Sequence, residues 1–472
     1  MTRPQISLSV GQNEYLSPHD GEMHAVLTVA AQGPDGPETT VPEAAEVIAI
    51  DCSGSMHYPP TKLAGARRAA AAAVDAMRDG VHFAIVAGTD TATKVFPADV
   101  GLVPADPTSR TAAKRALRDL TAIGGTAMGT WLRLANRLLA AHPAAVRHVM
   151  LLTDGRNEHE TSEQLKAVLA ECAGRFVCDA RGIGVDWAPE ELMAIVQALH
   201  GTADAVEDVD DLVADFAAMT RAAMGRVLPD VRVRVRTAPF ARLRFVKQVL
   251  PTRSDLTSFG VVVDARTTVL PTGAWGAETR DFHVCLDIDR GTVPPDEEVQ
   301  AARVDLVVLD GDVPHPVAGP VPVRVHRTED LRLSSVLHPA VAHYTGQSEM
   351  GLAVMAGYDA YDVGDAARAE QEWGRAIALA SGLGNGHVLD RLARLVDVVG
   401  DPADGKVRVK TAVSPHDLLA LAMSSVMSSQ VRDVDTAGEA SGPDVVCAHC
   451  CHVCPPGARF CVACGRSIGA DA

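Results

Sequence analysis

The sequence contains few aromatic residues and no excess of positive charge. Aromatic side chains make up 4% of the 472 residues, and the formal net charge is −17. A chain with this charge does not offer the broad basic surface that attracts nucleic acid or an acidic membrane. The scarcity of aromatic rings also leaves little for base stacking. We therefore expect neither nucleic acid nor a membrane among its partners.

Long apolar segments and a nucleotide-binding loop are also missing from the sequence. No uninterrupted apolar run reaches the ~18 residues of a membrane span, and the first residues lack the apolar core of a signal peptide. Four scattered cysteines lie outside the last 26 residues, a usage typical of a reducing compartment: Cys52, Cys172, Cys178 and Cys285. We expect a cytoplasmic protein. Because no GxxxxGK[ST] motif occurs, any ATPase would have to be a separate chain.

Short polar motifs follow two predicted buried strands, at 46–50 and 148–152. The motifs are Asp51-Cys52-Ser53-Gly54-Ser55, Gly125-Thr126 and Thr153-Asp154-Gly155. In open α/β sheets ligands bind beyond the carboxyl ends of the strands, so the three loops are predicted to meet at one cation. Two carboxylates with three hydroxyls form an all-oxygen ligand set, which suits Mg²⁺, Mn²⁺ or Ca²⁺ better than Zn²⁺.

This pattern resembles the metal-ion-dependent adhesion site of von Willebrand factor type A domains. The resemblance implies that five residues bind the cation, directly or through water: Asp51, Ser53, Ser55, Thr126 and Asp154. It also implies that one coordination position stays open for an Asp or Glu carboxylate of a partner protein. Because short Asp/Ser motifs also cap helices, the alternative is a set of capping and turn residues without a metal.

Strands alternate with amphipathic helices through residues 44–226, which predicts an α/β domain with a doubly wound parallel sheet. Residues 227–328 instead contain short alternating strands separated by turn signals, which predicts an antiparallel β-sandwich. Residues 1–43 hold two more alternating strands, too few to fold alone. We predict that these strands join the sandwich, so that the α/β domain is inserted in it; a free N-terminal extension is the alternative. Similar arrangements occur in bacterial relatives of the type A family.

Residues 329–430 are predicted to be helical. A helical hairpin is expected at 348–362 and 365–381, and further helices at 388–398 and 414–428. The hairpin resembles one tetratricopeptide-like unit, but a single unit is below the usual requirement of about three repeats. A plain packing hairpin is therefore the preferred interpretation. The polar, small and acidic residues 431–446 are predicted to be a flexible linker.

The last segment, 447–472, resembles the short zinc ribbons of bacterial proteins. Two CxxC pairs there can supply four thiolates to one structural Zn²⁺: Cys447, Cys450, Cys461 and Cys464. A third pair, Cys451 and Cys454, would shorten the loop between the pairs, and two nearby histidines could also compete for the metal. Disulfides are the remaining alternative.

Three functions compete for this chain. The preferred one is a metal-dependent interaction scaffold that binds a partner's Asp or Glu, with the zinc ribbon as an accessory module. Bacterial relatives of similar layout are associated with kinase and phosphatase signalling. The second is an accessory subunit of a separate AAA-type ATPase or chelatase. The third, a metal-dependent hydrolase, needs a general base, and the nearby His57 and His159 are more typical of solvated loop residues. We therefore expect no enzyme activity.

Overall fold

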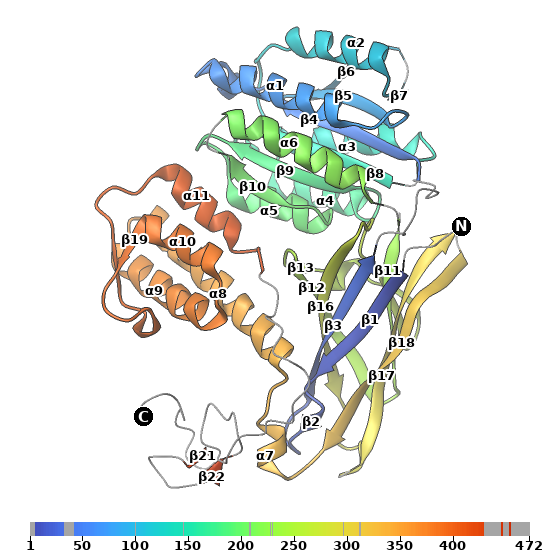
Figure 1. Ribbon diagram of the computed structural model, residues 1–472, viewed down its shortest axis with the longest axis vertical. Coiled ribbons are helices and arrows are strands. Elements are labelled where there is room, and N and C mark those ends of the chain that lie inside the picture. Colours follow the sequence, from blue (N-terminus) through green and yellow to red (C-terminus); the bar gives the residue numbers. More distant parts are fainter. Residues whose placement is uncertain are drawn as a thin grey trace.

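A computed structural model describes most of the 472-residue chain. The described residues are 5–32, 42–99, 101–144, 146–206, 209–226, 228, 230–295, 297–310, 313–428, 445–446 and 453–454. Figure 1 shows an α/β unit, a pair of long twisted sheets and a helical region. Within the described ranges, no helix combines the length and the apolar character needed to cross a membrane.

The α/β unit is built on one sheet. Its strands are β4 (Ala44–Asp51), β5 (His82–Gly88), β6 (Ala92–Phe96), β7 (Val103–Pro104), β8 (Val146–Thr153), β9 (Val177–Ile183) and β10 (Ala203–Val206). Their order is β10-β9-β8-β4-β5-β6, with β7 also paired to β5. The five strands from β10 to β5 run parallel, whereas β6 and β7 run antiparallel to β5. The predicted α/β class with a parallel sheet is confirmed.

Helices cover both faces of this sheet. One face packs against α1 (Thr61–Ala76), α2 (Pro107–Arg118) and α6 (Val209–Met224), and the other against α3 (Met128–Ala140), α4 (Ser162–Cys172) and α5 (Pro189–Ala198). The central strand β4 is buried along its whole length, with Ile48 and Ile50 in the first core and Val47 and Ala49 in the second. Burial on both faces explains why this strand has a nearly continuous apolar sequence.

Two further sheets enclose a separate core. The first has the order β1-β3-β16-β12-β13, with β1 (Gln5–Gln12), β3 (Glu22–Gln32), β16 (Glu278–Ile288), β12 (Ala241–Leu250) and β13 (Ser254–Asp255). The second has the order β14-β15-β11-β17-β18-β2, with β14 (Val261–Asp264), β15 (Thr267–Pro271), β11 (Val231–Thr237), β17 (Glu298–Asp310), β18 (Val313–Arg327) and β2 (Tyr15–Leu16). Neighbouring strands are antiparallel except β2 and β18. Phe282 of the first sheet and Val233 of the second belong to the same buried cluster.

The N-terminal strands belong to these sheets. Strand β3 pairs with β16 from Glu22 opposite Asp287 to Ala31 opposite Glu278, and β1 pairs with the other edge of β3. Figure 1 shows the blue N-terminal strands beside β12 and β16. The α/β unit is therefore inserted between strands of one sheet, and residues 5–32 are not a free extension.

The helical region contains α7 (Leu331–Ser334), α8 (Pro339–Asp362), α9 (Ala366–Leu383), α10 (Gly386–Leu395) and α11 (Pro415–Ser424), and the hairpin β19 (Val396–Val398) and β20 (Val407–Val409). The predicted helix at 388–398 was wrong at its end. At Val396 the backbone becomes extended, and residues 396–398 pair with β20. The helix predicted at 348–362 begins earlier, at Pro339, because Val341 and Tyr344 pack against Val26 of β3.

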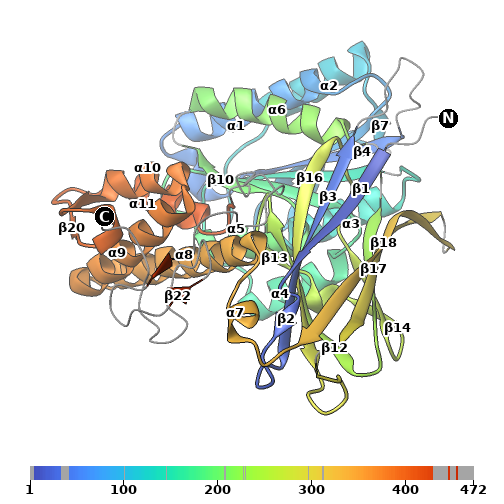
Figure 2. The ribbon, with the colours of Figure 1, turned by 60° about the horizontal axis from the view of Figure 1, so that its bottom comes forward.

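The helical region packs on the α/β unit. Tyr358 of α8 and Leu419 and Met423 of α11 belong to the same buried cluster as α3, α4 and α5. Figure 2 shows α10 and α11 beside β10, and α11 contacts β10. Arg253 lies between β12 and β13, and its guanidinium donates to the carbonyls of Ser348 at 2.9 Å and Ser425 at 2.6 Å. The helical region therefore contacts both the α/β unit and the first antiparallel sheet.

The C-terminal tail is described at four positions. Strand β21 (Val445–Val446) pairs with β22 (Val453–Cys454), so pairing begins inside the segment that we predicted to be a linker. The predicted zinc ligands Cys447, Cys450, Cys461 and Cys464 lie outside the described residues.

Candidate metal centre

Two neighbouring strands bring the predicted acidic ligands to the same edge of the sheet. Strand β4 ends at Asp51, and β8 ends at Thr153, just before Asp154. The two strands are paired in parallel, with Ile50 opposite Leu152. Both carboxylates therefore lie at the carboxyl edge, and both are completely buried.

Hydrogen bonds connect these carboxylates to the serine motif. Ser53 N donates to Asp51 Oδ1 at 2.8 Å, and the hydroxyls of Ser53 and Ser55 lie 2.9 Å apart. Ser55 Oγ in turn donates to Asp154 Oδ1 at 2.7 Å. On the other side, Thr153 Oγ1 donates to Asp51 Oδ2 at 2.6 Å. The serine motif therefore links the ends of β4 and β8.

The loop before α3 adds the threonine. Gly54 N donates to the carbonyl of Gly124 at 2.9 Å, and Ile123 N donates to the carbonyl of Cys52 at 2.7 Å. These bonds hold the threonine loop against the serine motif. Gly124 has a φ of +92°, a conformation that favours glycine and lets the chain turn toward Thr126. Thr126 is buried at the end of this turn.

The backbone at Gly155 shows that oxygen atoms of the loop at 51–55 and of the threonine loop face one small space beside the third loop. A Cβ atom built on Gly155 would lie 3.2 Å from Thr126 Oγ1, 3.3 Å from Ser55 Oγ and 3.8 Å from Asp51 Oδ2. Glycine leaves this space open. A carboxylate and two hydroxyls around one small space are donors that fit a hard divalent cation. Because Ser55 is exposed, the space is reached from solvent.

The electrostatics also favour a cation. Burial raises the pKa of Asp51 to about 6, although hydrogen bonds from Ser53 and Thr153 oppose the shift and the charge of Asp154 adds to it. Removing two neighbouring carboxylates from water is costly unless positive charge compensates them. A divalent cation at this position would supply that charge.

Lys62 is a charged neighbour that the sequence did not single out. It lies in the first turn of α1 and is 8% exposed. Its Nζ donates to Asp154 Oδ2 at 2.7 Å and to Asp186 Oδ2 at 3.2 Å. Burial lowers the pKa of Lys62, but these carboxylates outweigh burial and raise it. In the sequence, Lys62 is recognisable only as a basic residue shortly after the serine motif. Because lysines in a helix are usually solvated, this position did not indicate a contact with Asp154.

The two nearby histidines have different environments. His57 is exposed in the short 3₁₀ helix Gly54–His57. His159 packs over Gly125, where a Cβ atom would lie 2.0 Å from the ring. Thr126 N donates to His159 Nδ1 at 3.3 Å, and His159 N donates to the carbonyl of Thr126 at 3.0 Å. His159 therefore helps to position the threonine loop.

Comparisons with known proteins agree with this fold. A family profile of the von Willebrand factor type A domain matches residues 45–205. The structure of a von Willebrand factor type A protein from Catenulispora acidiphila is 41% identical, covers 91% of this chain and 98% of its own, and superposes with a TM-score of 0.84.

Two more distant proteins share part of this similarity. The ArnB paralog VWA2 from Sulfolobus acidocaldarius is 10% identical with a TM-score of 0.51, covering 89% of this chain and 98% of its own, which shows a similar fold. An uncharacterized protein from Synechocystis sp. is 27% identical over 215 residues, which are 44% of this chain and 49% of that protein. The chain thus spans about half the length of this curated relative.

Proposed function

Because this chain belongs to the von Willebrand factor type A family, we propose that it binds a partner protein through a divalent cation. The cation is held by Asp51, Ser53, Ser55, Thr126 and Asp154, and a partner's Asp or Glu carboxylate completes its coordination. The observation that carries this proposal is the convergence of oxygen atoms from Asp51, Ser55 and Thr126 on the space above Gly155. Mg²⁺, Mn²⁺ and Ca²⁺ are the cations that fit such oxygen donors.

The surface around this site supports a protein partner. Three large apolar side chains are exposed on the loops at the carboxyl edge of the sheet: Tyr58 at 80%, Ile123 at 71% and Val185 at 45%. Tyr58 follows the serine motif, Ile123 precedes Gly124, and Val185 follows β9. Apolar side chains around a charged centre are typical of protein interfaces, where they exclude water from the central contact.

A binding role also fits the polar groups near the site. The hydroxyl ligands are neutral, so they leave most of the cation's charge for an incoming carboxylate. Of the two nearby histidines, His57 is exposed and His159 Nδ1 accepts the Thr126 N–H. We therefore propose a binding site and not a catalytic one.

Affinity capture from native lysate tests this function. The wild type, Asp51→Ala and the control Asp75→Ala are compared, each with Mg²⁺ and with a chelator. Asp75 is a matched control because it is an exposed aspartate on α1 that pairs with Lys114. We expect a partner that wild type and Asp75→Ala retain with Mg²⁺, and that is lost with chelator or with Asp51→Ala.

The partner's carboxylate is tested next. Replacing the Asp or Glu of the captured protein that contacts the site should abolish metal-dependent binding. An ATPase among the captured proteins would favour the accessory-subunit function, whereas identical partner lists for all variants would reject a metal-dependent interaction.

The tail has a separate proposed role. Cys447, Cys450, Cys461 and Cys464 are proposed to bind one structural Zn²⁺, because two CxxC pairs offer a closed set of four thiolates. Cys447→Ser should then release one zinc equivalent, measured by atomic absorption, while the unfolding of the rest of the chain is unchanged.

A further inference from the structure

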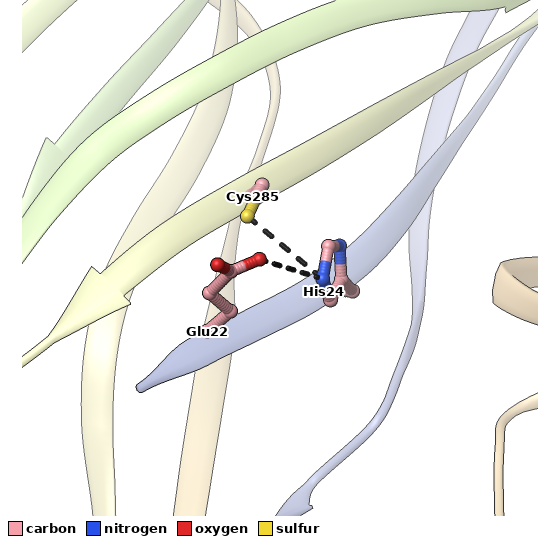
Figure 3. A group of neighbouring side chains, drawn as sticks. All are labelled: Glu22, His24 and Cys285. Carbon is pink, nitrogen blue, oxygen red and sulfur yellow. Dashed lines mark hydrogen bonds and ion pairs between the residues drawn. The ribbon is translucent and has the colours of Figure 1, made fainter. Parts of the chain in front are cut away.

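A second group of metal-binding side chains lies on the first antiparallel sheet, far from the loops of the α/β unit in the sequence. Glu22 and His24 project from β3, and Cys285 projects from β16 at the position opposite His24. Their neighbours Met23, Ala25 and Leu286 point into the core between the sheets. Because side chains alternate along a strand, the group lies on the sheet's opposite face. Figure 3 shows Glu22 and Cys285 both directed at the His24 ring.

The donor atoms of this group are close together. His24 Nε2 lies 3.7 Å from Glu22 Oε2 and 4.0 Å from Cys285 Sγ, and all three donor atoms lie within 4.8 Å of one another. Tetrahedral zinc, with bonds of ~2.0 Å to nitrogen or oxygen and ~2.3 Å to sulfur, separates its ligand atoms by about 3.3–3.7 Å. A contraction of about 0.5 Å for the two distances to His24 Nε2, and of at most about 1.3 Å between Glu22 and Cys285, would complete a zinc site. Glu22 is exposed, so its side chain has room to make this movement.

The neighbouring residues can orient two of these ligands. His24 Nδ1 lies 3.0 Å from His283 Nε2. In the tautomer with its proton on Nδ1, His24 donates to His283, and the lone pair of His24 Nε2 faces Cys285. A hydrogen bond on the other ring nitrogen is the usual companion of a metal-binding histidine. Glu22 Oε1 pairs with Arg244, which leaves Oε2 directed at His24.

Another group of possible metal ligands consists of Glu43, His82 and His142, and it differs in the position of a histidine proton. Glu43 Oε1 lies 3.6 Å from both His82 Nδ1 and His142 Nε2. Ala144 N donates to His142 Nδ1 at 3.1 Å, so the proton of the neutral ring is on Nε2, where a metal would bind. That nitrogen faces the Glu43 carboxylate, 3.6 Å away. This comparison favours the group on the antiparallel sheet.

We propose that Glu22, His24 and Cys285 bind one Zn²⁺ through a carboxylate, an imidazole and a thiolate, with the thiol proton released to solvent. Sulfur and nitrogen donors select zinc over the hard cations expected at the oxygen site. Glu22 and His24 also line a cavity of about 390 Å³, together with Asn13, His19 and Arg290. A fourth ligand, water or a small anion, therefore approaches from this cavity. Three protein ligands with an open fourth position distinguish the site from the closed tail site.

The test uses the full-length chain, with the six tail cysteines at 447–464 changed to serine so that no tail thiolate binds metal. Excess Mg²⁺ is present to occupy the oxygen site, and Co²⁺ is added as the spectroscopic probe for zinc. We expect one equivalent of Co²⁺ to give a thiolate-to-cobalt absorption band that Zn²⁺ abolishes. Cys285→Ala and His24→Gln should lose this band, because each removes a ligand.

Cys172→Ala is the matched control, since Cys172 is likewise a free, buried thiol, and this variant should keep the band. Glu22→Gln changes an exposed residue, so it tests the proposal without a risk to folding; we expect its Co²⁺ affinity to fall by about 10-fold or more. The proposal would be overturned if the protein with only its tail cysteines replaced gave no band with Co²⁺. Persistence of the band in Cys285→Ala would overturn it as well. Asp51→Ala should leave the band unchanged, so this test is independent of the oxygen site.

Discussion

Lys62 Nζ donates a 2.7 Å hydrogen bond to Oδ2 of the fully buried Asp154. The ammonium group is therefore an internal counter-charge beside the residues proposed to bind a divalent cation. It also reaches Asp186, which is largely exposed. Lys62 can stabilise the metal-free site by pairing with Asp154, and the same charge repels an incoming cation.

Replacing Lys62 by methionine tests this balance. We expect Lys62→Met to bind Mn²⁺ or Mg²⁺ about 10-fold more tightly, because one positive charge near the cation is removed. Isothermal titration calorimetry measures the change. Lys114→Met is the control, since Lys114 forms a comparable 2.7 Å ion pair with Asp75 on the surface. Weaker cation binding in Lys62→Met would show that the lysine chiefly positions Asp154.

Adding one methyl group at Gly155 should block the cation. The new Cβ would lie 3.2 Å from Thr126 Oγ1 and 3.3 Å from Ser55 Oγ, in the space that these oxygens surround. We expect Gly155→Ala to lose about 100-fold in cation affinity while its circular dichroism stays native. Gly101→Ala is the control, because a Cβ there meets no atom within 4 Å. Unchanged affinity in Gly155→Ala would place the cation elsewhere.

Removing the His159 ring should weaken the site without abolishing it. The ring accepts the Thr126 N–H at 3.3 Å and packs over Gly125, so it positions the threonine loop. We predict that His159→Ala lowers cation affinity by about 10-fold, whereas His57→Ala, which changes an exposed neighbour, has no effect. Complete loss of binding would mean that His159 is itself a ligand.

The buried His148 should make stability depend on pH. Its ring lies 2.8 Å from Glu46 Oε1 and 2.8 Å from Asp179 Oδ2. Burial disfavours the imidazolium, but the two carboxylates outweigh burial and raise the pKa of His148 to about 9. In the unfolded chain this pKa is about 6.5. The charged His148 ring therefore contributes fully to the free energy of unfolding below pH ~6.5. This contribution is lost as the pH rises through about 9.

Urea unfolding at several pH values measures this effect. We expect the free energy of unfolding to fall by up to about 3 kcal/mol across that interval in the wild type, and this part of the fall to vanish in His148→Gln. His19→Gln, at an exposed position, should retain the wild-type profile. Equal pH profiles for wild type and His148→Gln would show that His148 is neutral in the native protein.

The parallel-sheet domain could be predicted because its evidence is local. Strand β4 is buried on both faces, so its apolar run identifies it without its neighbours. Asp51 and Asp154 each follow such a run directly, and parallel strands place their carboxyl ends together. By contrast, the chain from Pro339 to Gln347 is helical where Val341 and Tyr344 meet the sheet, and that contact is not visible in a local pattern.

The sequence by itself determined the parallel sheet and the strands that deliver Asp51 and Asp154, because strand burial and strand ends are recorded in short runs of residues. Tertiary structure alone decided the position of Lys62, whose ammonium meets Asp154 across 92 residues of chain. It also decided the group around His24, because Cys285 is 261 residues away and reaches it through the register of β3 and β16. Register is set by which faces are buried together, a property of the assembled sheets and not of either segment.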